Sequence, residues 1–206
     1  VHVGTGPLSP ADIVAVARDG VGVALTDEAL SAIAKTREVV DHLAAADLPY
    51  YGVSTGFGAL ATRHIPVERR AQLQRSLIRS HAAGSGPEVE REVVRGLMVL
   101  RLSTLATGRT GVRPVTAQTY AAMLNAGITP VVREYGSLGC SGDLAPLAHC
   151  ALALMGEGEV RTASGEQVPA TSAVRSSWWR SWAARMSIAS IPSVPLISAR
   201  PSFSAS

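Results

Sequence analysis

Cys140, Ser141 and Gly142 form a run of three small residues in a glycine-rich turn, and this order allows an unusual reaction of the backbone itself. The nitrogen of Gly142 can attack the carbonyl carbon of residue 140, because glycine lacks a side chain and accepts strained dihedrals. Loss of water from the new ring and from the Ser141 hydroxyl leaves a methylene group on an imidazolone. The product is a strong electrophile made only from the backbone and one hydroxyl group.

An apolar helix pattern follows this run directly. Ser141 stands where a helix N-cap would stand, and Asp143 lies in the first turn. The sequence therefore predicts a helix that ends at Gly156 and whose positive end stabilises negative charge at the electrophile. Six apolar positions recur at the period of a helix with one buried face: Leu144, Leu147, Ala148, Ala151, Leu152 and Met155.

The whole stretch from Gly136 to His149, GSLGCSGDLAPLAH, resembles the signature of the aromatic amino acid ammonia-lyases. The resemblance implies that Cys140, Ser141 and Gly142 form the cofactor 4-methylidene-imidazol-5-one (MIO), and that Asp143 supports its formation. The family usually has Ala-Ser-Gly, and the cysteine should be tolerated because its side chain stays outside the chemistry. The competing interpretation is an ordinary serine-capped helix after a glycine turn.

A second run of this kind, Ala163-Ser164-Gly165, matches the usual family triplet more closely. It lies within residues 159–168, whose alternating pattern predicts a β-hairpin with this run at the turn. No helix pattern stands behind it, and an exposed turn lacks the compression that would force cyclisation. We therefore assign no chemistry to Ser164.

Tyr51 lies in the segment YYGVSTGFG, whose glycines let the backbone come close to a ligand. The segment resembles the tyrosine loop of the ammonia-lyases, which implies that Tyr51 is the catalytic base that removes a β-proton from the substrate. Ser54 is a mild departure, since the family often has Asn or Thr there. Without the resemblance, a half-buried aromatic side chain is the better interpretation of Tyr51.

Ser80 and His81 end a helix that is predicted over residues 66–83, just before Gly84. The segment resembles the substrate-selecting part of the family, in which members acting on histidine carry Ser-His and those acting on tyrosine or phenylalanine carry His-Leu or Phe-Leu. The resemblance therefore implies that Ser80 and His81 bind L-histidine, which is deaminated to urocanate and ammonia. For His81, the structural alternative is a histidine that interacts with free carbonyls at a helix end.

Two alternative functions stay open. One is a tyrosine or phenylalanine ammonia-lyase or aminomutase, and the other is a catalytically dead helical fragment that only associates with other subunits. Ultraviolet absorbance of the MIO, together with an assay for urocanate, would separate these alternatives from a histidine ammonia-lyase.

Composition and charge argue against several other classes of protein. The chain has 19 Lys and Arg against 16 Asp and Glu, but four of the arginines and none of the acids follow residue 170, which leaves 15 against 16 before it. We therefore expect no nucleic-acid surface.

No apolar run is long enough to span a membrane, and the five histidines lack metal spacing such as HExxH. The two cysteines, about 15 Å apart along one predicted helix, favour a reducing compartment, and we expect a cytoplasmic location.

The helices and strands predicted around these residues indicate a mainly α fold with a few short strands. The resemblance implies the N-terminal, cofactor-bearing part of an ammonia-lyase over residues 1–170, truncated before the central long-helix bundle, from a family that forms homotetramers. We expect residues 171–206 to be an aberrant, disordered tail rich in Ser, Arg and Trp, and this chain alone to be inactive. Helices are expected at residues 10–20, 27–46, 66–83, 89–106 and 116–125 and after residue 141, and strands at 1–6 and 128–132.

Overall fold

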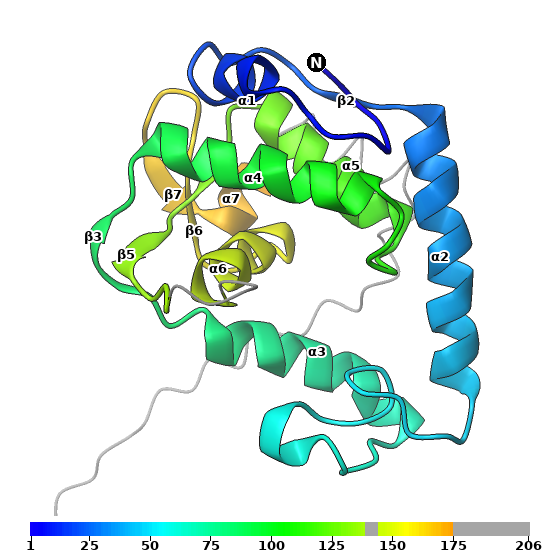
Figure 1. The fold of residues 1–206 in the computed structure, drawn as a ribbon. Helices are drawn as coiled ribbons and strands as arrows, with labels where there is room; N and C mark the ends of the chain where they lie inside the picture. Colours follow the sequence, from blue (N-terminus) through cyan, green and yellow to red (C-terminus); the bar gives the residue numbers. More distant parts are fainter. Residues whose placement is uncertain (139–143, 175–206) are drawn as a thin grey trace, which may run out of the picture. The chain divides into compact units, whose positions relative to one another are not determined.

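The computed structural model describes residues 1–138 and 144–174 of the 206-residue chain. These residues form seven α-helices, one short 3-10 helix and seven strands (Figure 1), so the prediction of a mainly α fold with a few short strands is confirmed. Helix α7, Ala170–Val174, crosses the predicted domain boundary at residue 170, and that boundary stays a prediction. Within the described ranges, no helix is both long and apolar enough to cross a membrane.

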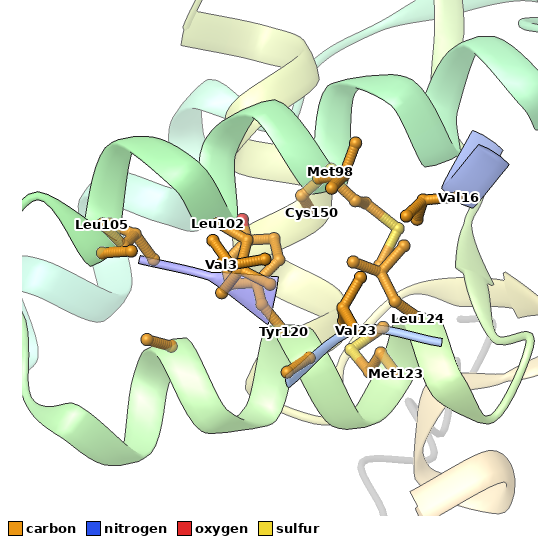
Figure 2. Close-up of a cluster of buried hydrophobic side chains, with 14 of the residues drawn as sticks. Val3, Val16, Val23, Met98, Leu102, Leu105, Tyr120, Met123, Leu124 and Cys150 are labelled. Carbon is orange, nitrogen blue, oxygen red and sulfur yellow. The ribbon is translucent and has the colours of Figure 1, made fainter. Parts of the chain in front are cut away.

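Helix α4, Arg91–Ala106, is the centre of the hydrophobic core. It packs against both α1, Pro10–Ala17, and α5, Pro114–Asn125. Each large apolar side chain that is fully buried stabilises the fold by about 1.5–3 kcal/mol. Figure 2 shows the cluster: Met98, Leu102 and Leu105 of α4 face Tyr120, Met123 and Leu124 of α5, and Val3, Val16 and Val23 complete it.

The first two helices begin where their capping residues predict. In α1, Ser9 Oγ accepts the Asp12 amide at 3.1 Å, and the Asp12 carboxylate accepts the Ser9 amide at 3.1 Å, which completes a capping box. In α2, Asp27–Ala45, Thr26 Oγ1 accepts the Ala29 amide at 3.2 Å. These bonds satisfy amides that have no partner within the helix, so both starts can be predicted from local sequence.

The turn between α4 and α5 lies directly against α2. Gly108 has a φ of +69°, and a Cβ atom built on it would lie 2.6 Å from Ala32 Cβ and 2.7 Å from the Ala32 carbonyl carbon. The Thr36 hydroxyl donates to the Gly108 carbonyl across the same contact. Because glycine alone combines this backbone conformation with so close an approach, the contact fixes the position of α2.

Two of the three small sheets link the ends of the helices. β1, His2–Val3, pairs in parallel with β2, Ala24–Leu25. The predicted hairpin is confirmed as β6, Glu159–Arg161, and β7, Gln167–Pro169, and β4, Thr129–Pro130, pairs antiparallel with β6.

The third sheet is not predicted by the sequence. β3, Ser85–Glu88, pairs antiparallel with β5, Arg133–Tyr135, in a register that aligns Ser85 with Tyr135. The preceding residue, Gly84, therefore comes next to Gly136, and a Cβ atom built on Gly136 would lie 3.1 Å from the Gly84 Cα. The sheet joins the segment that follows α3 to the start of the glycine-rich turn.

Helices α3 and α6 pack against each other beside this sheet. α3, Val67–His81, has no buried residue and follows the 3-10 helix η1, Gly58–Leu60. In α6, Leu144–Leu154, the predicted buried face is wrong in part, because Leu144 is 55% exposed. A Cβ atom built on Gly136 would lie 3.0 Å from Ala145 Cβ, so α6 turns small side chains toward its neighbours. The buried residues of α6 are Ala145, Ala148, Cys150 and Ala153.

Cys150 and Ala153 of α6 belong to the core cluster, and Figure 2 labels Cys150 within it. Cys150 is a free thiol with 1% of its surface exposed, and burial raises its pKa to about 12. The thiol is therefore protonated and shielded in the folded chain. The other cysteine, Cys140, lies outside the described residues.

Candidate functional site

The last turn of α3 holds Ser80 and His81 against one carbonyl group. His81 Nδ1 lies 2.8 Å from the Leu77 carbonyl oxygen, and Ser80 Oγ donates to the same oxygen at 2.9 Å. A ring nitrogen that faces a carbonyl oxygen carries the proton, so Nε2 is the acceptor in the neutral ring. His81 therefore interacts with a carbonyl in the last turn of the helix, although that carbonyl also accepts from Ser80, and this contact fixes the orientation of the ring that we expect to bind substrate.

Tyr51 is 65% exposed, which is more than the half-buried packing interpretation predicts. Its ring meets Phe57 edge to face, with centroids 5.7 Å apart, and its hydroxyl lies 3.4 Å from the Gly58 amide. The loop below it is held by the buried Ser54, whose hydroxyl donates to the Leu48 carbonyl at 2.9 Å. An exposed phenol on a fixed loop is able to meet a substrate.

Helix α3 contacts the loop of Tyr51 and also carries His81, but it does not bring the two side chains together. Gln74 Nε2 donates to the Gly52 carbonyl at 3.2 Å, which places the loop against the middle of α3. Seven residues separate Gln74 from His81, about 10 Å along a helix. Among the described residues, Tyr51 and His81 share no hydrogen bond or ring contact.

The end of α3 does meet the stretch that was predicted to carry the cofactor. The Gly84 amide donates to His149 Nε2 at 3.1 Å. A Cβ atom built on Gly84 would lie 2.9 Å from this nitrogen and 3.2 Å from Arg133 Cβ, so a larger residue would displace its neighbours. The fold therefore places the segment that follows Ser80 and His81 beside α6, whose sequence directly follows the triplet.

An ion pair fastens the same two parts of the chain. Arg79 Nε donates to Glu157 Oε2 at 2.8 Å, and Arg79 Nη2 donates to Oε1 at 2.6 Å. The hydrogen bond from Arg79 holds the pKa of Glu157 below its usual range, and Glu157 raises the pKa of Arg79. Because both side chains are partly exposed, the pair contributes little to stability, and its two-point geometry serves mainly to orient α3 on the turn that follows α6.

Cys140, Ser141, Gly142 and Asp143 lie outside the described residues, so their roles in forming and supporting a cofactor stay predictions. The structure describes the residues on either side of this gap. Before the triplet, the backbone at Gly136 is packed closely between the segment after α3 and α6. After it, α6 follows at once, and the N-terminus of a helix stabilises negative charge.

The second triplet is a hairpin turn, as predicted. Gly165 has a φ of +86°, and its amide donates to the Thr162 carbonyl at 3.0 Å. The hydroxyl of Ser164 is exposed and lies 2.8 Å from that of Thr162. No helix of the described ranges begins at this turn. A Cβ atom built on Gly165 would meet nothing within 4 Å, although Ala163 at the start of the turn lies close to Gly127.

Sequence reasoning gave no role to His149, Gln74 or Arg79, which make the contacts described above. For His149 the predicted face of the helix gave no signal, because that face included Leu144 and not Ala145, which lies four residues before His149 and is buried in the structure. The partners of Gln74 and Arg79 are distant in sequence, and no local pattern marks them. In the described part of the chain, no group of three or more His, Cys, Asp or Glu could hold a metal ion.

Comparisons with known proteins agree on one family. The family model for aromatic amino acid lyases matches residues 8–185. The histidine ammonia-lyase of Streptomyces coelicolor is 65% identical over 170 residues, which are 82% of this chain and 33% of that protein. The histidine ammonia-lyase of Streptomyces griseus is 66% identical over the same length, 82% of this chain and 33% of that protein.

A solved structure shows the same fold. Tyrosine aminomutase from Streptomyces globisporus superposes with a TM-score of 0.80 at 36% identity, over 86% of this chain and 33% of that protein. The chain thus spans about a third of the length of the relatives and the solved structure that it matches.

Proposed function

Because this chain belongs to the aromatic amino acid lyase family, we propose that the protein that carries it is a histidine ammonia-lyase. Its reaction is the non-oxidative deamination of L-histidine to urocanate and ammonia. The observation that carries the proposal is the 65% identity to a histidine ammonia-lyase over 170 residues. The Ser80-His81 pair supports the same substrate, and its segment contacts α6 through the Gly84–His149 hydrogen bond.

We further propose that Cys140, Ser141 and Gly142 supply an MIO cofactor in this site, with Asp143 as its support. The close packing at Gly136 supports this, because a compressed backbone favours cyclisation over an extended one. When formed, the group supplies an electrophilic methylene that takes up the substrate amine and makes it a better leaving group.

The other residues of the site bind the substrate and move its proton. His81 orients the substrate ring, because Nε2 of His81 is free to accept from an imidazole N–H once Nδ1 is held by Leu77. Ser80 holds the same turn through its own bond to Leu77. Tyr51, acting as a phenolate, takes the β-proton as the carbon–nitrogen bond breaks and ammonia leaves, and its exposed side chain can meet the substrate.

A second candidate is a lyase or aminomutase acting on tyrosine. The observation that favours it is the TM-score of 0.80 with a tyrosine aminomutase. Identity to that protein is 36%, against 65% for the histidine ammonia-lyase, and the Ser80-His81 pair also disfavours it.

A chimaera tests the proposal. In it, the 170 matching residues of this chain replace those of the Streptomyces coelicolor relative. We expect the chimaera to form urocanate from L-histidine, followed by ultraviolet absorbance, and to act far more slowly on tyrosine and phenylalanine. Faster turnover of tyrosine or phenylalanine would favour the second candidate. No turnover of any of the three would support a catalytically dead segment.

The remaining expectations concern the protein as a whole. We propose a homotetramer in the cytoplasm, with L-histidine as a small-molecule partner and no nucleic acid or membrane. The near balance of 15 basic and 16 acidic residues before residue 171 supports the absence of a nucleic-acid surface. Size-exclusion chromatography of the chimaera with light scattering measures the oligomeric state.

A further inference from the structure

His149 is the one side chain of α6 that hydrogen-bonds to the segment after α3 in the described part of the chain. The bond runs from the Gly84 amide to His149 Nε2 at 3.1 Å. An amide can only donate, so Nε2 must be unprotonated and the ring proton must lie on Nδ1. The contact therefore exists only while the imidazole is neutral.

The surroundings of this bond leave little room for another arrangement. A Cβ atom built on Gly84 would meet both His149 Nε2 and Arg133 Cβ, and one built on Gly136 would lie 3.0 Å from Ala145 Cβ. The backbone at Gly84, the backbone at Gly136 and helix α6 are thus closely packed around the His149 ring. If the hydrogen bond is lost, the half-buried Gly84 amide loses its only protein partner among the described residues.

The charges around His149 favour the neutral ring. Burial lowers the pKa of His149 below 6.5, and Arg133 of β5 lowers it further. The segment after α3 contributes the Gly84 amide to this contact. Within α3, Arg79 is paired with Glu157, and the ring of His81 is bonded to the Leu77 carbonyl. The contact is therefore complete at neutral pH and is lost as the pH falls through the folded-state pKa.

We propose that His149 is a positioning residue that holds the segment after Ser80 and His81 against α6, and that it does so only in its neutral form. The inference rests on the proposed function for the roles of His81 and the triplet. Gly84 lies three residues after His81, and α6 begins at Leu144, two residues after Gly142 in the sequence.

The first test uses the 206-residue chain and does not depend on enzyme activity. Nitrogen-15 NMR measures the tautomer of His149 and the hydrogen exchange of the Gly84 amide over a pH series. We expect Nε2 to be unprotonated at pH 7 and the Gly84 amide to lose its protection with the same midpoint as His149. The proposal would be overturned by a proton on Nε2 at neutral pH. It would also be overturned if the hydrogen exchange rate of the Gly84 amide did not change as His149 titrates.

The second test uses the chimaera and three variants. His149→Phe removes the acceptor, and we expect kcat/KM for histidine to fall roughly ten-fold, which corresponds to the loss of one hydrogen bond. In His149→Gln the side-chain oxygen can accept the same amide without titrating, so activity should return and become less sensitive to acid. His42→Phe, an exposed histidine of α2, is the matched control and should change nothing.

The two tests separate the failure of this inference from that of the proposed function. An active chimaera that tolerates His149→Phe, or whose acid sensitivity persists in His149→Gln, contradicts the positioning role alone. A chimaera that forms no urocanate contradicts the proposed function, and the NMR series then still decides whether His149 holds Gly84.

Discussion

The contact between Gly108 and α2 gives a prediction in which one glycine serves as control for another. Gly108 and Gly20 have nearly the same φ, +69° and +70°. A Cβ atom on Gly20 would meet nothing within 4 Å, whereas one on Gly108 would lie 2.6 Å from Ala32 Cβ. Substitution by alanine therefore imposes the same backbone strain at both positions, but creates a steric clash only at Gly108.

The magnitudes follow from these two contributions. An alanine held at positive φ costs about 1–2 kcal/mol, so Gly20→Ala should lower the free energy of unfolding by about that amount. Gly108→Ala adds an overpacking cost of about 1–3 kcal/mol, because α2 must move away from the turn. The smaller entropy of the unfolded alanine variants, about 0.4–1 kcal/mol, affects both equally and cancels in the comparison.

Thermal unfolding followed by circular dichroism measures the difference. At about 2–4 °C per kcal/mol for a chain of this size, Gly108→Ala should melt about 2–12 °C below Gly20→Ala. Equal melting temperatures for the two variants would refute the close approach of α2 to the turn between α4 and α5. A Gly20→Ala variant that melts lower than Gly108→Ala would refute it more strongly.

Three further predictions concern the proposed site. Ser141→Ala should abolish the loss of two waters that cyclisation produces, as measured by intact mass of the chimaera, whereas Ser164→Ala should leave the mass deficit unchanged. Tyr51→Phe should keep the mass deficit but lower turnover by about 10²–10⁴-fold, the usual contribution of a general base, and a near-normal rate would remove Tyr51 from the mechanism. Replacing Ser80 and His81 by Phe and Leu should weaken the use of histidine in favour of phenylalanine, and unchanged kcat/KM ratios would mean that the substrate ring is recognised elsewhere.

Local chemistry made part of the fold predictable. Ser9 with Asp12, and Thr26 before its helix, set the starts of α1 and α2 through hydrogen bonds within four residues. The hairpin around Ser164 is equally local, because its turn and both strands lie within a few residues. Such features depend only on residues that are close in sequence, so they can be predicted from a single sequence.

Contacts between distant segments could not be predicted in the same way. β3 contains Ser85, Gly86, Pro87 and Glu88, none of which favours a strand, and it exists because β5 lies beside it. The apolar period of α6 predicted a buried Leu144, but the closeness of Gly136 turns Ala145 inward instead.

The same limit applies to the candidate site. Tyr51, Ser80 and His81 were found from family motifs, whereas the role of His149 depends on a backbone amide 65 residues away. No pattern in the sequence connects two such groups, because the connection is made by the fold.

The burial of Cys150 makes it a natural reporter of transient opening in the folded chain. A thiol with 1% exposure and a pKa near 12 is almost unreactive toward alkylating agents, since only an accessible thiolate attacks them. Each modification event at Cys150 therefore records a moment at which the core around Cys150 opens. With Cys140 changed to the alanine that the family usually carries, a single labelling rate would time this internal fluctuation without any added probe.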